Sequence, residues 1–282
     1  MKKTTLNVLL LLLASSTVNA AVDMQFLQGL GDTRYHDVAS DGVERSYHVY
    51  VMLPDGYDQS SDKKYPTIYV LDGGALFPLL TSYYRYLNFG EEIPDAIIVG
   101  ISYGSATFEG GNYRSTDYTA PSPERNYWGG AAKFQHFLGD ELLPFIENTY
   151  NSRPDRRAIF GQSISGQFVL YTALTKPNLF WGHVASNPAL HRNLEFFLQE
   201  HAEPSPASGQ SRLFVASATL DDPQFRKPAL KWIEHWSGRE GPWQLKTENL
   251  EGHSHMSAPP TSFRRGMRWL FSTETGSQTR LQ

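Results

Sequence analysis

The segment RRAIFGQSISGQF, residues 156–168, contains the strand-to-helix turn from which the remaining organisation of the chain can be worked out. A short apolar run ends at Gly161, Ser163 follows two residues later, and Gly166 opens a segment with a helical pattern. This order is close to the G-x-S-x-G nucleophile elbow, a sharp turn that lifts a serine hydroxyl clear of a sheet. Ser165 stands where the second glycine of the motif is expected. The segment therefore predicts either a nucleophile elbow or an ordinary turn in which Ser163 caps a helix.

Short apolar runs alternate with helical patterns along the rest of the chain. The run at 45–53 alternates between apolar and polar residues, as a strand with one exposed face does, whereas later runs are continuously apolar and indicate strands covered on both faces. These buried strands are expected at 66–72, 96–102, 157–161, 183–188 and 212–218, and helices at 131–149, 166–175, 226–236 and 261–271. The alternation predicts an α/β fold with a mostly parallel central sheet and helices on both faces. Since no linker or repeat divides the chain, we expect residues 21–282 to form a single domain.

The first twenty residues have the features of a secretory signal peptide, with Lys2 and Lys3 before a leucine-rich run and small residues up to Ala20. We expect cleavage after Ala20, a periplasmic or secreted location and no stable membrane insertion afterwards; the alternative is a permanent N-terminal anchor. Losing both lysines lowers the formal charge from −4 to about −6, which argues against a nucleic-acid partner. The chain has no cysteine, which excludes thiol catalysis and cysteine-based metal sites.

A serine nucleophile needs a base and an acid, and in this architecture the chain order is serine, acid, histidine. A polar loop between a strand-like run at 242–250 and the last predicted helix carries His253 and His255, so either histidine would lie over the strand ends. The strand at 212–218 runs into Asp221 and Asp222. We favour Asp221 as the acid that orients the base, although an Asp-Asp-Pro sequence is also typical of a helix start.

Backbone amides are available to bind an oxyanion at two of the predicted strand ends. YVLDGGALF, residues 69–77, ends a strand in Asp72-Gly73-Gly74, where amides can face a ligand without a side chain in the way. The amide of Ile164 lies at the start of the helix that follows Ser163. His253-x-His255 lacks both an HExxH motif and a clear third ligand, and there is no phosphate-binding glycine loop, so we expect no metal and no cofactor.

Four stretches of the chain resemble the family of α/β hydrolases that contains esterase D and the enterobactin-type siderophore esterases. They are YVLDGGALF, GGNYRSTDYTAPSP, FGQSISGQFVLYTALTKPNLFWGHVASNPAL and EGHSHMSAPPTSFRRGMRWLF, and the resemblance covers residues 42–272. In that family the catalytic histidine is followed by one variable residue and a serine, which points to His255 rather than His253. The resemblance implies the α/β-hydrolase fold, Ser163 as nucleophile and the amides of Gly74 and Ile164 as oxyanion donors.

The resemblance also suggests residues that bind the substrate. Arg114 and Asp117 match an Arg-x-x-Asp element near the family's active-site rim, and Tyr113 and Tyr118 stand beside them. The alternative is a surface loop held by a salt bridge between the two charged residues. The aromatic side chains of residues 103–128 are suited to stacking on catechol or other aryl groups, or to packing against one another.

These features predict a serine carboxylic ester hydrolase that acts on a small-molecule ester, with siderophore trilactones and aryl esters as candidate substrates. Because the net charge is negative, any attraction of an anionic iron complex would have to be local, from Arg85, Arg114 or Arg125. Two alternatives stay open: an acyltransferase that uses the same acyl-enzyme, and an inactive binding module in which Ser165 marks the loss of activity. The sequence predicts no particular oligomeric state.

Overall fold

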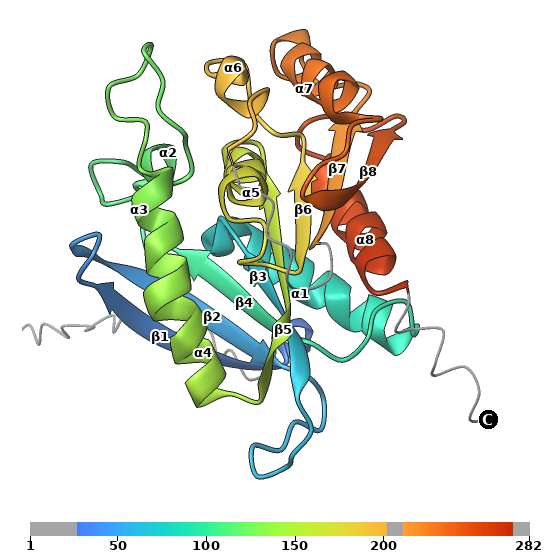
Figure 1. The fold of residues 1–282 in the computed structure, drawn as a ribbon. Coiled ribbons are helices and arrows are strands. Elements are labelled where there is room, and N and C mark those ends of the chain that lie inside the picture. Colours follow the sequence, from blue (N-terminus) through green and yellow to red (C-terminus); the bar gives the residue numbers. More distant parts are fainter. Residues whose placement is uncertain (1–26, 202–210, 273–282) are drawn as a thin grey trace, which may run out of the picture.

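The computed structural model describes residues 27–201 and 211–272 (Figure 1). The predicted signal peptide, residues 1–20, lies outside these ranges. Within the described part of the chain, no helix has the length and apolar character needed to cross a membrane.

The described residues contain an eight-stranded sheet with the strand order β1-β2-β4-β3-β5-β6-β7-β8. β1 pairs with β2 and β2 with β4 in antiparallel fashion, whereas the neighbours from β4 through to β8 are parallel. The strands are β1 (Asp32–Ser40), β2 (Arg45–Leu53), β3 (Tyr65–Val70), β4 (Ile97–Ser102), β5 (Ser152–Gln162), β6 (Gly182–Ser186), β7 (Ser211–Ala218) and β8 (Trp243–Leu250). The prediction of a mostly parallel central sheet is confirmed.

Helices cover both faces of this sheet, as the sequence predicts (Figure 1). On one face lie α1 (Gly73–Phe89) and α8 (Ala258–Leu270); on the other lie α3 (Ala131–His136), η3 (Phe137–Leu142), α4 (Leu143–Thr149), α5 (Ile164–Thr175) and α7 (Pro223–Trp236). Short helices are η2 (Gln28–Leu30), α2 (Arg114–Asp117) and α6 (Leu194–Phe197). Successive side chains of a strand point to opposite faces, so Ile68 and Tyr69 of β3 are buried in two different cores. This double burial is the reason that the central strands are continuously apolar.

Apart from the short helices, three elements differ from the sequence-based expectation. The helix expected at 131–149 is continuous, but its middle turn, η3, is a π-helix that ends at Leu142, two residues before Pro144. Proline has no amide hydrogen to donate to the preceding turn, which accounts for the irregularity. α1 was not predicted because Gly73, Gly74 and Pro78 are poor helix formers. β1 was not predicted because most of its residues are exposed and polar, as suits the edge of a sheet.

The polar residues that the sequence singles out follow the carboxyl ends of parallel strands. Asp72 comes after β3, Ser163 after β5, Asp221 after β7 and His255 after β8. In a parallel sheet these ends meet at one edge, where open α/β sheets bind their ligands. The fold therefore brings residues from distant parts of the chain to a common site.

Candidate active site

Ser163 lies in a strained turn between β5 and α5. Its backbone has φ 60° and ψ −116°, a conformation that residues other than glycine rarely adopt. Three hydrogen bonds hold this turn: the Ser163 amide donates to the Ser186 carbonyl at 3.0 Å, and the Ser163 carbonyl accepts from the amides of Gln167 at 2.9 Å and Ala189 at 3.0 Å. The structure thus forms the strand-to-helix turn that a nucleophile elbow requires.

The close contact between strand and helix at this turn involves two glycines. A Cβ on Gly161 would overlap the carbonyl of Ser165, and a Cβ on Gly166 would lie 2.9 Å from the Ser186 carbonyl oxygen. Ser165 itself is fully buried, and its hydroxyl accepts a hydrogen bond from the Gln162 amide at 2.8 Å. The glycine contact at Gly161 involves the Ser165 backbone, so the hydroxymethyl group is hydrogen-bonded within the turn.

His255 forms a hydrogen-bonded pair with Asp221. The distance from His255 Nδ1 to Asp221 Oδ2 is 2.8 Å, and the carboxylate is almost completely buried. Asp222 has a different role, since its side chain accepts a hydrogen bond from the Gln224 amide at 2.8 Å and so caps α7. With Nδ1 paired to Asp221, Nε2 is the ring nitrogen left to exchange a proton with a hydroxyl.

The loop that carries His255 is tied to the elbow. Gln162 donates a hydrogen bond from Nε2 to the His255 carbonyl at 2.8 Å, and the His255 ring packs against Phe225 with 5.1 Å between the ring centres. His253 lies outside the cavity described below, with its Nε2 3.3 Å from the Thr261 hydroxyl. Gln162 was not predicted as a site residue, because it occupies a position that the elbow motif leaves variable.

Ser163 and His255 line the same cavity, which has a volume of about 730 Å³. This volume is within the range of small-molecule binding sites. Tyr50, Leu76 and Met256 contribute apolar surface to its wall. The arrangement can hold an ester next to a serine hydroxyl and an imidazole.

The two predicted oxyanion donors are the amides of residues at helix starts. Gly74 lines the cavity as the second residue of α1, and Ile164, which follows Ser163, is the first residue of α5. The first amides of a helix have no partner inside it and lie at the positive end of the helix dipole. Space is also restricted, because a Cβ on Gly73 would lie 2.6 Å from the backbone of β4 and one on Gly74 would lie 2.9 Å from the Ser102 hydroxyl. The glycine pair thus lets α1 begin directly against the sheet.

Arg114 lines the cavity and pairs with Asp72 rather than with Asp117. Its Nε and Nη2 donate to the two carboxylate oxygens of Asp72 at 2.7 and 2.8 Å. Burial alone would lower the pKa of the Arg114 guanidinium, but the hydrogen bonds and charge of Asp72 raise it above its ordinary value. The cavity therefore contains a paired cation whose charge is already compensated.

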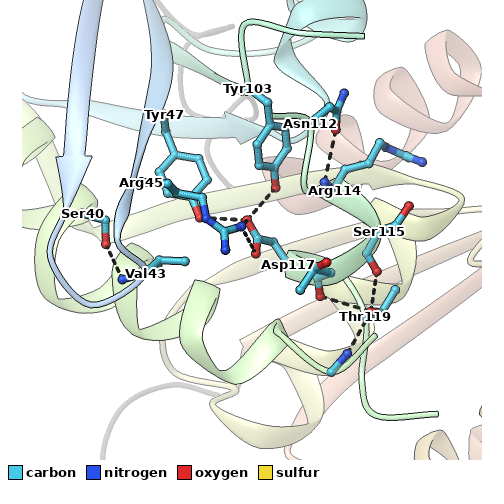
Figure 2. A network of polar contacts seen from close by, with 12 residues as sticks. Ser40, Val43, Arg45, Tyr47, Tyr103, Asn112, Arg114, Ser115, Asp117 and Thr119 are labelled. Carbon is cyan, nitrogen blue, oxygen red and sulfur yellow. Dashed lines mark hydrogen bonds and ion pairs between the residues drawn. The ribbon is translucent and has the colours of Figure 1, made fainter. Parts of the chain in front are cut away.

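Asp117 is buried at the centre of a separate network of polar contacts, which Figure 2 shows. Its carboxylate accepts two hydrogen bonds from Arg45 at 2.8 and 3.0 Å, one from Tyr47 at 2.8 Å and one from Tyr103 at 3.1 Å. Burial raises the pKa of Asp117 above its ordinary value, although the charge of Arg45 and these hydrogen bonds oppose the shift. Since Tyr103 lines the cavity, the network supports the wall from behind.

The other residues that the sequence suggests as substrate contacts are Asp117, Tyr113 and Tyr118. None of the three lines the cavity, and Tyr118 is fully buried. Tyr113 instead packs under the guanidinium of Arg45, at 4.2 Å from the ring centre. Of the four candidates, Arg114 is the one that lines the cavity.

A mostly parallel sheet with helices on both faces, and a strained serine after a central strand, define an α/β hydrolase. Residues 40–260 match the model of the family described as "Putative esterase", and the chain belongs to that family. The family resemblance drawn from the sequence motifs is thereby confirmed.

Individual relatives carry the names of siderophore esterases. The ferri-bacillibactin esterase BesA of Bacillus subtilis is 33% identical over 183 residues, which is 60% of this chain and 62% of that protein. The apo-salmochelin esterase of Escherichia coli is 28% identical over 207 residues, or 67% of this chain and 64% of that protein. The matched regions thus span less than two thirds of these relatives.

The crystal structure of the BES protein from Bacillus cereus has the same fold. It superposes with a TM-score of 0.74 at 23% identity and covers 95% of this chain and 99% of that one.

Proposed function

We propose that this protein is a serine carboxylic ester hydrolase with Ser163 as nucleophile, His255 as base and Asp221 as the acid that orients His255. The observation that carries this proposal is that Ser163, in its strained turn, lines one cavity with a histidine that is hydrogen-bonded to a buried carboxylate. The names of the curated relatives, all esterases, support the reaction class.

In the first half-reaction the Ser163 oxygen bonds to the ester carbonyl carbon while its proton passes to His255 Nε2. The C–O bond to the leaving alkoxide then breaks, and the alkoxide takes that proton and departs as an alcohol. In the second half-reaction water attacks the acyl-enzyme and gives a proton to His255, which returns it to Ser163 as the carboxylic acid leaves. Asp221 holds the imidazole in the required tautomer and stabilises its protonated form.

The amides of Gly74 and Ile164 are proposed to bind the negative oxygen that forms when Ser163 attacks. Both stand at helix starts, where the helix dipole favours negative charge. Because such donors are already in place before the reaction, they stabilise the transition state without a cost of reorganisation.

As substrate we propose a siderophore trilactone or a related aryl ester, a class supported by the names of the relatives. Among the described residues that line the cavity, the formally charged side chains are Asp72 and Arg114, which neutralise each other. Arg85 and Arg125 do not line it. A ferric tris-catecholate complex is highly anionic, whereas the iron-free trilactone is neutral, so we expect the iron-free form to be the better substrate.

A panel of p-nitrophenyl esters, together with iron-free and ferric trilactones, tests the proposal on purified residues 21–282. We expect ester hydrolysis by the wild type and loss of at least about a thousandfold in kcat for Ser163→Ala. Equal rates for wild type and Ser163→Ala on every ester would overturn the proposed function. Faster cleavage of the ferric complex would overturn the preference for the neutral substrate alone.

We also propose that residues 1–20 are removed on export and that the enzyme acts in the periplasm or outside the cell. The signal-peptide pattern at the N-terminus supports this location. N-terminal sequencing of the protein from a periplasmic fraction should begin at Ala21. Recovery of the uncleaved chain in the membrane fraction would contradict the proposal.

A further inference from the structure

The hydroxyl of Ser165 lies between two strand ends of the site. Its Oγ accepts the hydrogen bond from the Gln162 amide at the end of β5 and is 2.8 Å from Oδ2 of Asp72, after β3. The Gln162 carbonyl is also 2.8 Å away, but a hydrogen bond to an ionised acceptor is the stronger one, so the single hydroxyl proton points to Asp72. A glycine at position 165 has no atom that could make this link.

Asp72 is itself held in an unusual backbone conformation. Its φ of 54° and ψ of 39° fall in the left-handed region, and its carboxylate is held by Arg114 and Ser165 together. Its carbonyl accepts the amides of Ala75 and Leu76, which starts α1. The orientation of Asp72 therefore sets the direction in which α1 begins.

The two proposed oxyanion donors come from these two separate strand ends. Gly74 is two residues after Asp72, and Ile164 is one residue before Ser165. An oxyanion site stabilises the transition state only if both amides reach the same oxygen, and a misplacement of about 1 Å can cost about a hundredfold in rate. Any side-chain link between the strand ends thus acts on the spacing of the donors.

We propose that Ser165 is a positioning residue whose hydroxyl ties the nucleophile elbow to Asp72 and so fixes the spacing of the Gly74 and Ile164 amides. This inference rests on the proposed function, because it assigns Ser165 a part in ester hydrolysis. The serine in the motif's glycine position is then a functional replacement that strengthens the site.

The test compares Ser165→Ala, Asp72→Asn and the double variant in steady-state hydrolysis of a p-nitrophenyl ester. For Ser165→Ala we expect kcat to fall about tenfold with KM changed less than about twofold, because the oxyanion forms only after substrate has bound. If the hydroxyl acts through Asp72, the double variant should be no slower than the slower single variant.

A second readout is the rate of labelling by a fluorophosphonate. Here the Ser163 oxygen bonds to phosphorus, the P–F bond breaks, fluoride leaves and the serine proton passes to His255. The phosphoryl oxygen occupies the oxyanion site, so labelling of Ser165→Ala should also slow about tenfold.

Ser152→Ala is a matched control, since Ser152 is a buried serine at the other end of β5. Its hydroxyl is 2.7 Å from the Thr67 hydroxyl, so this pair links the same two strands away from the site. Both alanine variants should lower the melting temperature, whereas Ser152→Ala should leave kcat and the labelling rate unchanged.

Wild-type kcat and labelling rate in Ser165→Ala would overturn this inference and leave the proposed function intact. Additive losses in the double variant, or equal losses of kcat in Ser152→Ala, would overturn it as well. A wild-type protein that neither hydrolyses esters nor reacts with the fluorophosphonate would overturn the proposed function, and the inference would fall with it.

Discussion

Replacing Asp221 by asparagine should abolish most of the activity without unfolding the protein. The buried Asp221 carboxylate is 2.8 Å from His255 Nδ1 and accepts the Asp222 amide with its other oxygen at 2.7 Å. Asparagine has nearly the same shape, but it carries no charge and offers either an amide oxygen or an NH₂ group to the imidazole. In the second orientation Nδ1 must accept a hydrogen bond, which places the proton on Nε2, the nitrogen that must act as base.

In the serine-protease triad this change lowers kcat about 10⁴-fold, and we expect about 10²- to 10⁴-fold here. That range corresponds to about 3–5 kcal/mol of lost transition-state stabilisation. Rates of p-nitrophenyl ester hydrolysis, with thermal unfolding recorded in parallel, measure both effects.

Asp222→Asn is the matched control, because it makes the same change one residue away. Asn caps a helix about as well as Asp, so the cap of α7 should survive and kcat should stay within about twofold of wild type. Loss of activity in Asp222→Asn with Asp221→Asn unaffected would refute the assignment of the acid.

Three further predictions concern stability. Burial in β6 lowers the pKa of His183 to about 3 from its ordinary value of 6.5. Since the unfolded chain then takes up a proton at His183 that the folded one does not, His183 should contribute a loss of about 2 kcal/mol of stability between pH 7 and pH 5. In urea titrations His183→Leu should lose less stability than wild type over this range by about that amount, and an equal loss in both proteins would contradict the assignment. Arg45→Met should lower the free energy of unfolding by about 2–4 kcal/mol in the same assay, because it leaves the buried Asp117 without its cation. A decrease below about 0.5 kcal/mol would contradict the network. Gly73→Ala should lower the melting temperature more than Gly74→Ala. The new Cβ at position 73 meets backbone atoms, whereas the one at position 74 meets a serine hydroxyl that can rotate. The reverse order would contradict the packing at the start of α1.

The arrangement of the central sheet and the position of the elbow could be predicted from local patterns. Strands that are buried on both faces are continuously apolar, and Ser163 stands directly after such a run. Strand ends in a parallel sheet meet at one edge, so chain order brought Asp221 and the loop with His253 and His255 into the same prediction, and the family resemblance selected His255. The sequence favoured Asp221 over Asp222 only by its position, and the structure gives the two residues different contacts, since Asp221 pairs with His255 and Asp222 caps α7.

Contacts between distant segments could not be predicted in the same way. Arg114 and Asp117 are three residues apart in the chain, which suggested a mutual salt bridge, yet Arg114 pairs with Asp72 and Asp117 with Arg45. Both partners are set by the position of α2, which packs against α3 and α5, and this position cannot be predicted from local spacing. The environment of Ser165 depends on the same long-range geometry, because its hydroxyl meets a residue from another strand end.

Reaction with a fluorophosphonate tests the central claim most directly, because it reports an activated serine without knowledge of the natural substrate. The purified wild-type protein should be labelled at one site, and mass spectrometry of peptides should place the label on Ser163. Ser163→Ala should remain unlabelled at a melting temperature close to that of wild type. Labelling of Ser163→Ala to the same extent, or a folded wild-type protein that does not react, would contradict the account.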